Sequence, residues 1–219
     1  HREAEAVLLR YRQRRDVENA AFARTLAADY ERALPHTELD RLSASGLLAI
    51  TVPAEYGGID VSNAVLAEVT AILSEADSSI GQIPQNHLGV VAAIRTVSDK
   101  AQQELLFGEV LRGIRFGNAF SEFGTKRAAE FETRFSDEGD HILVTGRKFY
   151  STGALLAHLV PIVAVDDEQR AWYAIAERDA PGLTVIDDWS SFGQRTTASG
   201  TVLLDRVKVP KTHLVPGYK

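Results

Sequence analysis

The sequence predicts an α+β fold in which a helical domain is followed by an antiparallel β-barrel or sandwich domain. Apolar residues recur at helical spacing along the first half of the chain. From Phe116 onward, short runs of β-branched and aromatic residues alternate with turn sequences, and no helical stretch separates them. This order favours a helical domain over residues 1–115 and a β-domain over residues 116–215.

The helix boundaries follow from apolar periodicity and from capping residues. Phe22, Leu26 and Tyr30 recur every four residues, and Pro35 ends the helix that they predict. The sequence Thr37–Asp40 resembles a capping box for a second helix. A first and a second helix are therefore expected before residue 46.

The next helices are predicted in the same way. Gly46 fits the stop of the second helix. Asp99 followed by Gln102 predicts the start of a helix that runs to Leu111. An apolar stripe between these points predicts another helix and consists of Val61, Val65, Val69, Ile72 and Leu73. Roughly four or five helices are expected up to about residue 114.

The second half contains short strand-like runs separated by turn residues such as Asp137–Asp140 and Asp179–Gly182. Strands at this spacing favour an antiparallel sandwich or a small barrel. The predicted strands are Glu130–Phe135, His141–Val144, Leu159–Val165, Trp172–Ala176, Leu183–Ile186 and Thr201–Leu204.

Composition and charge exclude several classes of protein. The chain of 219 residues has no cysteine, which excludes disulfides, thiolate catalysis and Cys-ligated metal clusters. The 24 Lys and Arg against 30 Asp and Glu give a net charge of −6, which argues against a nucleic-acid or anionic membrane partner. With no membrane-spanning apolar run and a polar N-terminus, a soluble cytoplasmic protein is expected.

Several catalytic and binding motifs are absent from the sequence. No G-x-G-x-x-G follows a strand, and no P-loop, H-E-x-x-H or G-x-S-x-G pattern occurs, so no metal site is predicted. Basic residues cluster on the expected first helix, where a solvated face explains them better than a nucleic-acid contact. They are Arg10, Arg12, Arg14 and Arg15.

Three segments, taken together, resemble the acyl-CoA dehydrogenase fold. Gly46–Gly58 resembles its helix-to-helix crossing, Gly117–Glu122 its first β-domain strand, and Gly146–Ala154 its second flavin-contacting segment. The resemblance covers residues 15–215 in the expected order. It implies a flavin cofactor and a C-terminal helical domain that has no counterpart in this chain.

Details of these motifs resemble one branch of that superfamily. Ser121–Phe123 replaces the usual threonine-glutamate-proline run, and Tyr150–Thr152 replaces the usual tryptophan-isoleucine-threonine run. Asp187–Trp189 followed by Gly193–Gly200 resembles dibenzothiophene monooxygenases and sulfur-acquisition oxidoreductases. That branch implies reduced FMN supplied by a separate flavin reductase, O2, a small organosulfur substrate, and a homo-oligomer, expected to be a tetramer.

The resemblance also assigns candidate site residues. Asn118, Ser121, Thr152 and Trp189 are the candidate flavin-binding residues, and Tyr150 is the candidate substrate-side wall. Amide and hydroxyl groups suit the polar edge of a flavin ring, whereas an indole suits its flat face. Each residue also has an ordinary structural interpretation, as a turn, strand or core residue. The flavin hypothesis requires Asn118, Thr152 and Trp189 to share one slot.

His87 is the candidate catalytic residue. It lies in an otherwise apolar helix, and a neutral imidazole that lines a pocket can give or take a proton during oxygen transfer. The alternative is a core histidine whose ring nitrogens are satisfied by the protein.

Two other functions stay open at this point. The first is a true FAD-dependent acyl-CoA dehydrogenase, which the altered motifs around Ser121 and Tyr150 disfavour. The second is a non-catalytic relative that serves as a binding or scaffold subunit.

Overall fold

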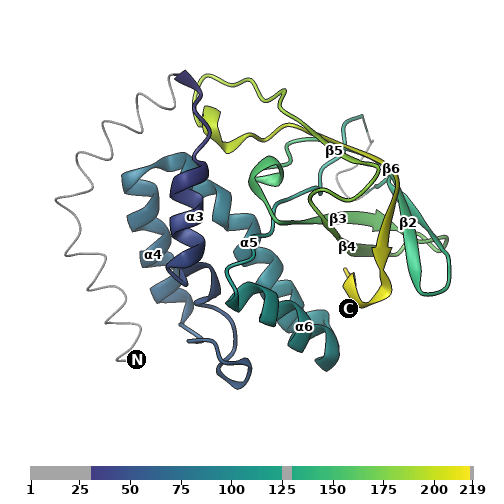
Figure 1. Cartoon of the computed structure of the whole chain (residues 1–219), viewed down its shortest axis with the longest axis horizontal. Helices are drawn as coiled ribbons and strands as arrows, with labels where there is room; N and C mark the ends of the chain where they lie inside the picture. The colour runs from purple at the N-terminus through teal and green to yellow at the C-terminus, as the bar shows by residue number, and fades with distance from the viewer. Residues whose placement is uncertain (1–30, 125–129, 218–219) are drawn as a thin grey trace.

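The computed structural model describes residues 31–124 and 130–217. A layer of helices packs beside a β-domain, and the chain passes from one to the other at residues 112–118 (Figure 1). None of the helices in the described part of the chain is long and apolar enough to cross a lipid bilayer.

The described helices are α3 (His36–Ala44), α4 (Asn63–Ala76), α5 (Ser78–Val97) and α6 (Lys100–Leu111), with short 3-10 turns η1 (Leu47–Ala49) and η2 (Ala54–Tyr56). Helices α3, α4 and α6 lie close to the segments that the sequence indicates, and α5 lies in a stretch for which the sequence predicts no bounds. The capping box predicted for α6 is confirmed, because Asp99 Oδ1 accepts from the Gln102 N–H at 2.9 Å. Gly46 follows α3 with φ 79°, in the left-handed region that suits glycine.

Two details of the helix prediction are wrong. The cap of α3 is Pro35, which makes no side-chain capping bond, so Thr37 does not serve as the cap. Val61 precedes α4 because Ser62 is the capping residue there, and its hydroxyl accepts from the Val65 N–H. The stripe of Phe22, Leu26 and Tyr30 lies outside the described residues, as does the basic run from Arg10 to Arg15.

A seven-stranded sheet forms the β-domain, with the order β5-β6-β2-β1-β3-β4-β7. The strands are β1 (Arg134–Asp137), β2 (His141–Lys148), β3 (Leu159–Val165), β4 (Ala171–Glu177), β5 (Leu183–Ile186), β6 (Thr201–Pro210) and β7 (Leu214–Pro216). The β1–β3 pairing is parallel, at Arg134 and Val165, while the other strand pairings of this sheet are antiparallel. The sheet is therefore mixed rather than purely antiparallel.

Every predicted strand overlaps an observed one, with three differences. Strand β1 starts at Arg134 instead of Glu130, because the backbone N–H groups of Glu132 and Thr133 are bound by a carboxylate instead of a neighbouring strand. Strands β2 and β6 run further than predicted, and they pair across a bulge at Val144. Strand β7 is too short for its periodicity to be read from sequence.

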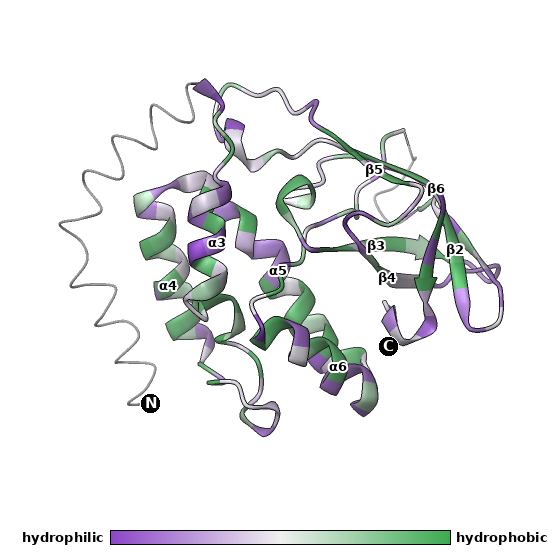
Figure 2. Cartoon of the chain, viewed as in Figure 1, coloured by the Kyte–Doolittle hydropathy of each residue, from purple (hydrophilic) through white to green (hydrophobic). Residues whose placement is uncertain are grey.

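The two halves share a core. Strand β3 is buried along its whole length and forms a continuous hydrophobic run in Figure 2. One apolar cluster joins α5 and α6 to β3 and β4 through residues such as Ile94, Phe107, Leu159 and Ile175. The junction is also polar: Arg115 is buried and donates to the carbonyls of Leu156 and Leu39, which lie in the two different halves. This shared core fixes the β-domain against the helices.

Candidate functional site

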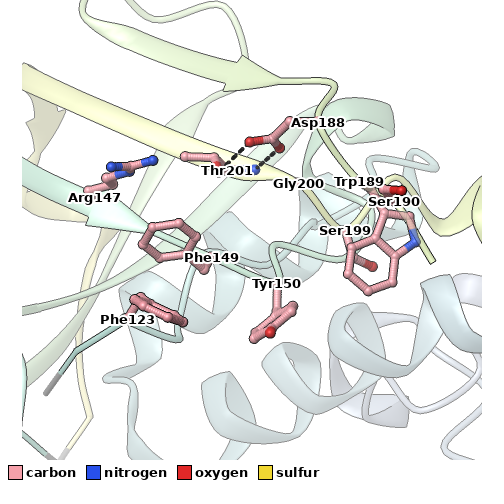
Figure 3. Close-up of a pocket in the computed structure, with 10 residues that line it drawn as sticks. All are labelled: Phe123, Arg147, Phe149, Tyr150, Asp188, Trp189, Ser190, Ser199, Gly200 and Thr201. Atoms are coloured by element: carbon pink, nitrogen blue, oxygen red, sulfur yellow. Dashed lines mark hydrogen bonds between the residues drawn. The ribbon is translucent and has the colours of Figure 1, made fainter.

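A pocket of about 460 Å³ opens on the β-domain, where the ends of β2 and β6 meet the loop that follows β5 (Figure 3). This volume falls in the range of ordinary small-molecule sites, roughly 300–1,000 Å³. The described residues that line it are Phe123, Arg147, Phe149, Tyr150, Asp188, Trp189, Ser190, Ser199, Gly200 and Thr201. Two of the candidate site residues, Tyr150 and Trp189, are among these lining residues.

Aromatic rings dominate the pocket wall. The Tyr150 and Trp189 rings meet edge to face with centroids 6.0 Å apart, and Phe123 lies 5.5 Å from Phe149. Phe123 is 75% exposed and Tyr150 is 59% exposed, although aromatic rings of this kind are usually covered. In Figure 3 the rings of Phe123, Phe149 and Tyr150 lie along one side of the pocket, and the Trp189 ring lies on the other side. They offer flat apolar faces to a planar ligand.

Backbone pairing brings the predicted residues together. Ser121 accepts from the Phe149 N–H at 2.9 Å, and Ser151 donates its N–H to the Gly200 carbonyl at 3.1 Å. The segment around residue 120, the end of β2 and the start of β6 therefore lie side by side. Ser121 itself is exposed beside this wall, although it is not among the lining residues.

Asn118 supports the corner of the pocket that carries Tyr150. Its side-chain amide donates to the Tyr150 carbonyl at 3.4 Å, and its Oδ1 accepts from the Phe120 N–H at 3.0 Å. Tyr150 has φ 52°, a left-handed conformation that is strained for a bulky residue. The same carbonyl also accepts from the Thr152 N–H at 2.9 Å. Asn118 therefore positions Tyr150 with one hydrogen of its side-chain NH2 group, and the second hydrogen is available to a ligand.

Thr152 belongs to a chain of hydroxyl groups below the pocket. Its Oγ1 lies 2.8 Å from Ser199 Oγ, which lies 2.8 Å from Thr197 Oγ1. Thr197 in turn donates to the Gln194 carbonyl at 3.0 Å. The Trp189 indole N–H donates to that same carbonyl at 3.1 Å. Thr152 and Trp189 are therefore linked through the loop between β5 and β6.

This loop is held in an uncommon conformation. Gln194, just before η4 (Arg195–Thr197), has φ 49°, and Ala198, just after it, has φ 47°. Both are non-glycine residues in the left-handed region. The Gln194 side chain donates to the Ser78 carbonyl at the start of α5, at 3.3 Å. This hydrogen bond connects the loop to the helical half and helps to hold Trp189 in position.

Asp188 ties the same loop to β6. Its carboxylate accepts from the Thr201 backbone N–H at 2.8 Å and from the Thr201 hydroxyl at 2.7 Å. These hydrogen bonds hold the pKa of Asp188 below its usual range. Asp188 stays ionised at neutral pH and fixes the residue next to Trp189.

A buried ion pair supports the wall from behind. Glu122 lies 2.5 Å from Lys148, and both side chains are almost fully buried. Burial raises the pKa of Glu122, but hydrogen bonds from Lys148 and from the Glu132 N–H outweigh it, and the net pKa is lowered. Burial lowers the pKa of Lys148. The pair locks Ser121 and Phe149, which are its chain neighbours, against each other.

His87 lies away from the pocket, at the junction between the two halves. It is 1% exposed, its Nδ1 accepts from the Phe116 N–H at 3.0 Å, and its Nε2 therefore carries the hydrogen and donates to the Leu48 carbonyl at 3.0 Å. Burial lowers the pKa of His87 to about 4. The geometry matches the satisfied core histidine and leaves no ring nitrogen of His87 for a bound molecule.

Sequence reasoning missed most of the lining residues. Phe123, Arg147 and Ser199 each lie within segments that the motifs include, yet none has a side chain that marks it as a ligand contact. Arg147 is the only basic side chain among the described lining residues, and it packs over the Phe149 ring at 4.6 Å. No cluster of three or more metal-ligating side chains occurs within the described ranges.

The residues of this pocket fit an isoalloxazine ring. Exposed aromatic faces at Tyr150 and Phe123 offer an apolar wall, while Thr152 and Ser199 offer hydroxyl oxygens and Asn118 an amide hydrogen. A flavin ring requires an apolar face and a few hydrogen-bond partners at its polar edge. Tyr150, Phe123 and Ser199 line the pocket, while Thr152 and Asn118 lie behind it in hydrogen-bond contact with Ser199 and Tyr150.

Comparison with protein families gives a match over the helical half. A model of the acyl-CoA dehydrogenase N-terminal domain matches residues 3–113. Among curated proteins, the chain is 30% identical to the 3-sulfinopropanoyl-CoA desulfinase of Cupriavidus necator over 209 residues, covering 91% of this chain and 50% of that protein. It is 31% identical to a dibenzothiophene monooxygenase of Rhodococcus erythropolis over 196 residues, covering 85% and 46%.

Solved structures give a similar picture. The methanesulfinate monooxygenase MsuC from Pseudomonas fluorescens superposes with a TM-score of 0.81 at 27% identity, covering 94% of this chain and 52% of that one. TdsC from Paenibacillus sp. A11-2, in a complex with FMN and indole, gives a TM-score of 0.78 at 26% identity, covering 92% and 52%. The chain spans about half the length of the proteins that it matches.

Proposed function

The chain belongs to the acyl-CoA dehydrogenase family, through its N-terminal domain, and we propose that it is part of a flavin-dependent monooxygenase. The proposed reaction uses reduced FMN and O2 to oxygenate a small organosulfur compound. The observation that carries the proposal is the joint placement of Tyr150 and Trp189 in one pocket on the β-domain, with Thr152 hydrogen-bonded to the lining residue Ser199.

The proposed binding mode assigns a task to each side chain. Tyr150 and Trp189 cover the faces of the ring and keep water from it, while Thr152 and Ser121 meet its polar edge. Asn118 holds the left-handed corner at Tyr150 and turns its remaining amide hydrogen toward the ring. When bound, reduced FMN supplies the electrons that activate O2. The protein contributes binding, orientation and exclusion of water.

Similarity supports the choice of substrate class. The desulfinase, the dibenzothiophene monooxygenase and MsuC carry sulfur substrates in their names, and TdsC was solved with FMN. Apolar rings line the pocket together with a single described cation, Arg147. A small sulfur compound with an apolar body and at most one anionic group suits this lining.

The proposal extends to partners. Reduced FMN implies a separate flavin reductase and a cytoplasmic location where that reductase works. Exposed aromatic side chains at Phe123 and Tyr150 also suit coverage by further protein, in line with a homo-oligomer, proposed to be a tetramer.

The alternative is an FAD-dependent acyl-CoA dehydrogenase. The family as a whole and the CoA ester in the name of the desulfinase keep this alternative in view. It predicts tight FAD binding and flavin reduction by an acyl-CoA.

A titration separates the two functions. The protein is titrated with reduced FMN under anaerobic conditions, and with FMN and FAD in air. O2 consumption is then followed with methanesulfinate or dibenzothiophene present. The proposal expects reduced FMN to bind most tightly, and O2 uptake to yield an oxygenated sulfur product. Tight FAD binding with bleaching of the flavin by butyryl-CoA would overturn it, and absence of flavin binding would favour a non-catalytic relative.

A further inference from the structure

An ion pair connects the two halves of the molecule beside the pocket. Arg32 lies in the helical half, and its two terminal amino groups donate to the two carboxylate oxygens of Asp187, one of them at 3.2 Å. Asp187 follows β5 and stands two residues before the lining residue Trp189. Figure 1 shows the first described residues of the helical half beside this loop. The pair therefore joins positions 155 residues apart, next to the candidate site.

The geometry of this pair is more specific than that of an ordinary surface ion pair. A planar guanidinium that meets a carboxylate through two hydrogen bonds fixes the orientation of its partner as well as the distance. The Arg32 and Asp187 side chains are 25% and 41% exposed, and the Arg32 Nε is buried. Arg32 also has φ 58°, a left-handed conformation that a non-glycine residue keeps only where its surroundings enforce it. Arg32 is thus held on the helical side, and it holds the start of the loop through Asp187.

Trp189 depends on this loop for its position. Its indole N–H donates to the Gln194 carbonyl of the same loop, and Asp188 connects the loop to β6. Both contacts lie within the β-domain, so neither holds the loop to the helices. The Gln194 side chain donates to the Ser78 carbonyl of α5 at 3.3 Å, which is a long hydrogen bond between neutral groups. The charged pair at Asp187 is the stronger of these two connections to the helical half, and it lies closer to Trp189 in sequence.

We infer that Arg32 is a positioning residue, which acts through Asp187 to hold the Trp189 ring across the pocket from Tyr150. Without the ion pair, the loop between β5 and β6 keeps its attachment to β6 but loses a charged attachment to the helical half, and the Trp189 ring moves away from Tyr150 more easily. The consequence for flavin binding rests on the proposed function. The inference extends that site to a residue outside the pocket lining.

The test uses the fluorescence of Trp189 and the affinity for reduced FMN. In Trp172→Phe protein, Arg32→Gln should shift the emission of Trp189 to longer wavelength without any ligand, because the indole becomes more exposed to water. The same substitution should weaken the binding of reduced FMN about fivefold at low salt. Asp187→Asn should have the same effect, and the two substitutions together should be no worse than either alone, because both remove one interaction.

Arg95→Gln is the matched control. Arg95 also donates to both carboxylate oxygens of an aspartate, Asp60, but that pair lies within the helical half. Its loss should leave the emission unchanged and the affinity within about twofold of wild type.

Exchange of the charges provides a rescue. Arg32→Asp combined with Asp187→Arg should restore most of the lost affinity, which would not happen if the single variants merely destabilised the fold. Salt provides a further readout, because it screens a partly exposed pair. At about 1 M salt, wild type and Arg32→Gln should therefore converge in affinity.

The inference is overturned if Arg32→Gln leaves the emission of ligand-free Trp189 unchanged, or if Arg95→Gln shifts it equally. It is also overturned if flavin binds with the same affinity to wild type and to Arg32→Gln at low salt. A wild-type protein that binds neither oxidised nor reduced FMN overturns the proposed function, and the emission of Trp189 alone then decides the inference.

Discussion

The junction around His87 and the pocket around Trp189 both bring together segments that are distant in sequence, but they treat polar groups in opposite ways. At the junction, His87 satisfies Leu48 and Phe116, and both of its ring nitrogens are used. At the pocket, aromatic faces stay exposed and hydroxyl oxygens keep unused lone pairs. The first arrangement stabilises the fold, whereas the second leaves binding capacity for a ligand.

Electrostatics follow the same division. Burial at the junction lowers the pKa of His87 to about 4 and keeps the ring neutral. At the pocket, Asp188 is exposed to solvent and stays ionised because Thr201 hydrogen-bonds to it. The pKa is therefore shifted in both regions, by burial at the junction and by hydrogen bonds to the charged form at the pocket.

The largest expected effect is on the junction. His87→Ala leaves the Phe116 N–H and the Leu48 carbonyl buried without partners and opens a cavity between α5 and the β-domain. We expect a loss of about 3–5 kcal/mol in the free energy of unfolding, measured by urea denaturation. His87→Gln, which keeps a donor and an acceptor, should recover about half of this loss. A loss below about 1 kcal/mol in His87→Ala would contradict the structural role.

The pH dependence of stability sharpens the comparison. The folded pKa of His87 is lowered to about 4, so the unfolded chain binds the extra proton first as the pH falls below about 6.5. Stability is thus complete above pH 6.5 and decreases on acidification, by about 2 kcal/mol at pH 5. Carboxylates with a lowered pKa, such as Asp166 at about 2, stabilise the fold at higher pH and lose that stabilisation only below about pH 4.

Burial lowers the pKa of His158 and His213 in the same direction, so the informative quantity is a difference. The slope between pH 6.5 and 5 is measured for wild type and for His87→Gln. The variant should lose most of the slope. Equal slopes in the two proteins would show that His87 titrates normally in the fold.

At the pocket, the expected effect is on binding instead of stability. Trp189→Ala removes one aromatic face, and we expect affinity for reduced FMN to fall roughly thirtyfold, or about 2 kcal/mol. The free energy of unfolding should change by less than about 1 kcal/mol, because the ring is only partly buried. Trp172→Phe, on β4, is the matched control and should keep full affinity. Equal losses of affinity in both variants would show that Trp189 does not contact the flavin.

The smallest effect is expected at Asn118. Asn118→Ala removes the amide that holds the Tyr150 carbonyl, at a cost of about 1 kcal/mol in unfolding free energy. Because Tyr150 then leaves its left-handed corner more easily, flavin affinity should also fall, by about threefold to fivefold. Asn118→Asp retains the acceptor for Phe120 but not the donor, and it should reproduce the loss of affinity. Unchanged affinity in both variants would show that Asn118 does not position Tyr150.

The sequence predicted the order of elements well because periodicity and caps are local signals. Asp99 and Gly46 act as the sequence indicated, and the strands fall between the predicted turns. The parallel pairing of β1 with β3 could not be foreseen, since it depends on contacts between distant segments. The backbone N–H groups of Glu132 and Thr133 lie in a segment with strand propensity, but they donate to the Glu122 carboxylate instead of to a neighbouring strand.

The candidate site was predictable where a motif carried it. Tyr150 and Trp189 line one pocket, Asn118 hydrogen-bonds to Tyr150 and Thr152 to the lining residue Ser199, and their role in binding a flavin stays a prediction. The position of His87 was not predictable, because whether a histidine on an apolar helix faces a cavity or a carbonyl is decided by η1, which lies far away in sequence. The hydrogen bonds of Ser199 and Thr197 could not be predicted for the same reason, since the hydroxyl groups meet only once the loop has folded.

The most direct test of the central claim uses the indole of Trp189 as a probe. In Trp172→Phe protein, Trp189 is the only tryptophan of this chain. Anaerobic titration with reduced FMN should quench its fluorescence saturably, with the same midpoint as flavin retention measured by ultrafiltration. Flavin that is retained without quenching Trp189 would contradict the account, because the cofactor would then lie elsewhere.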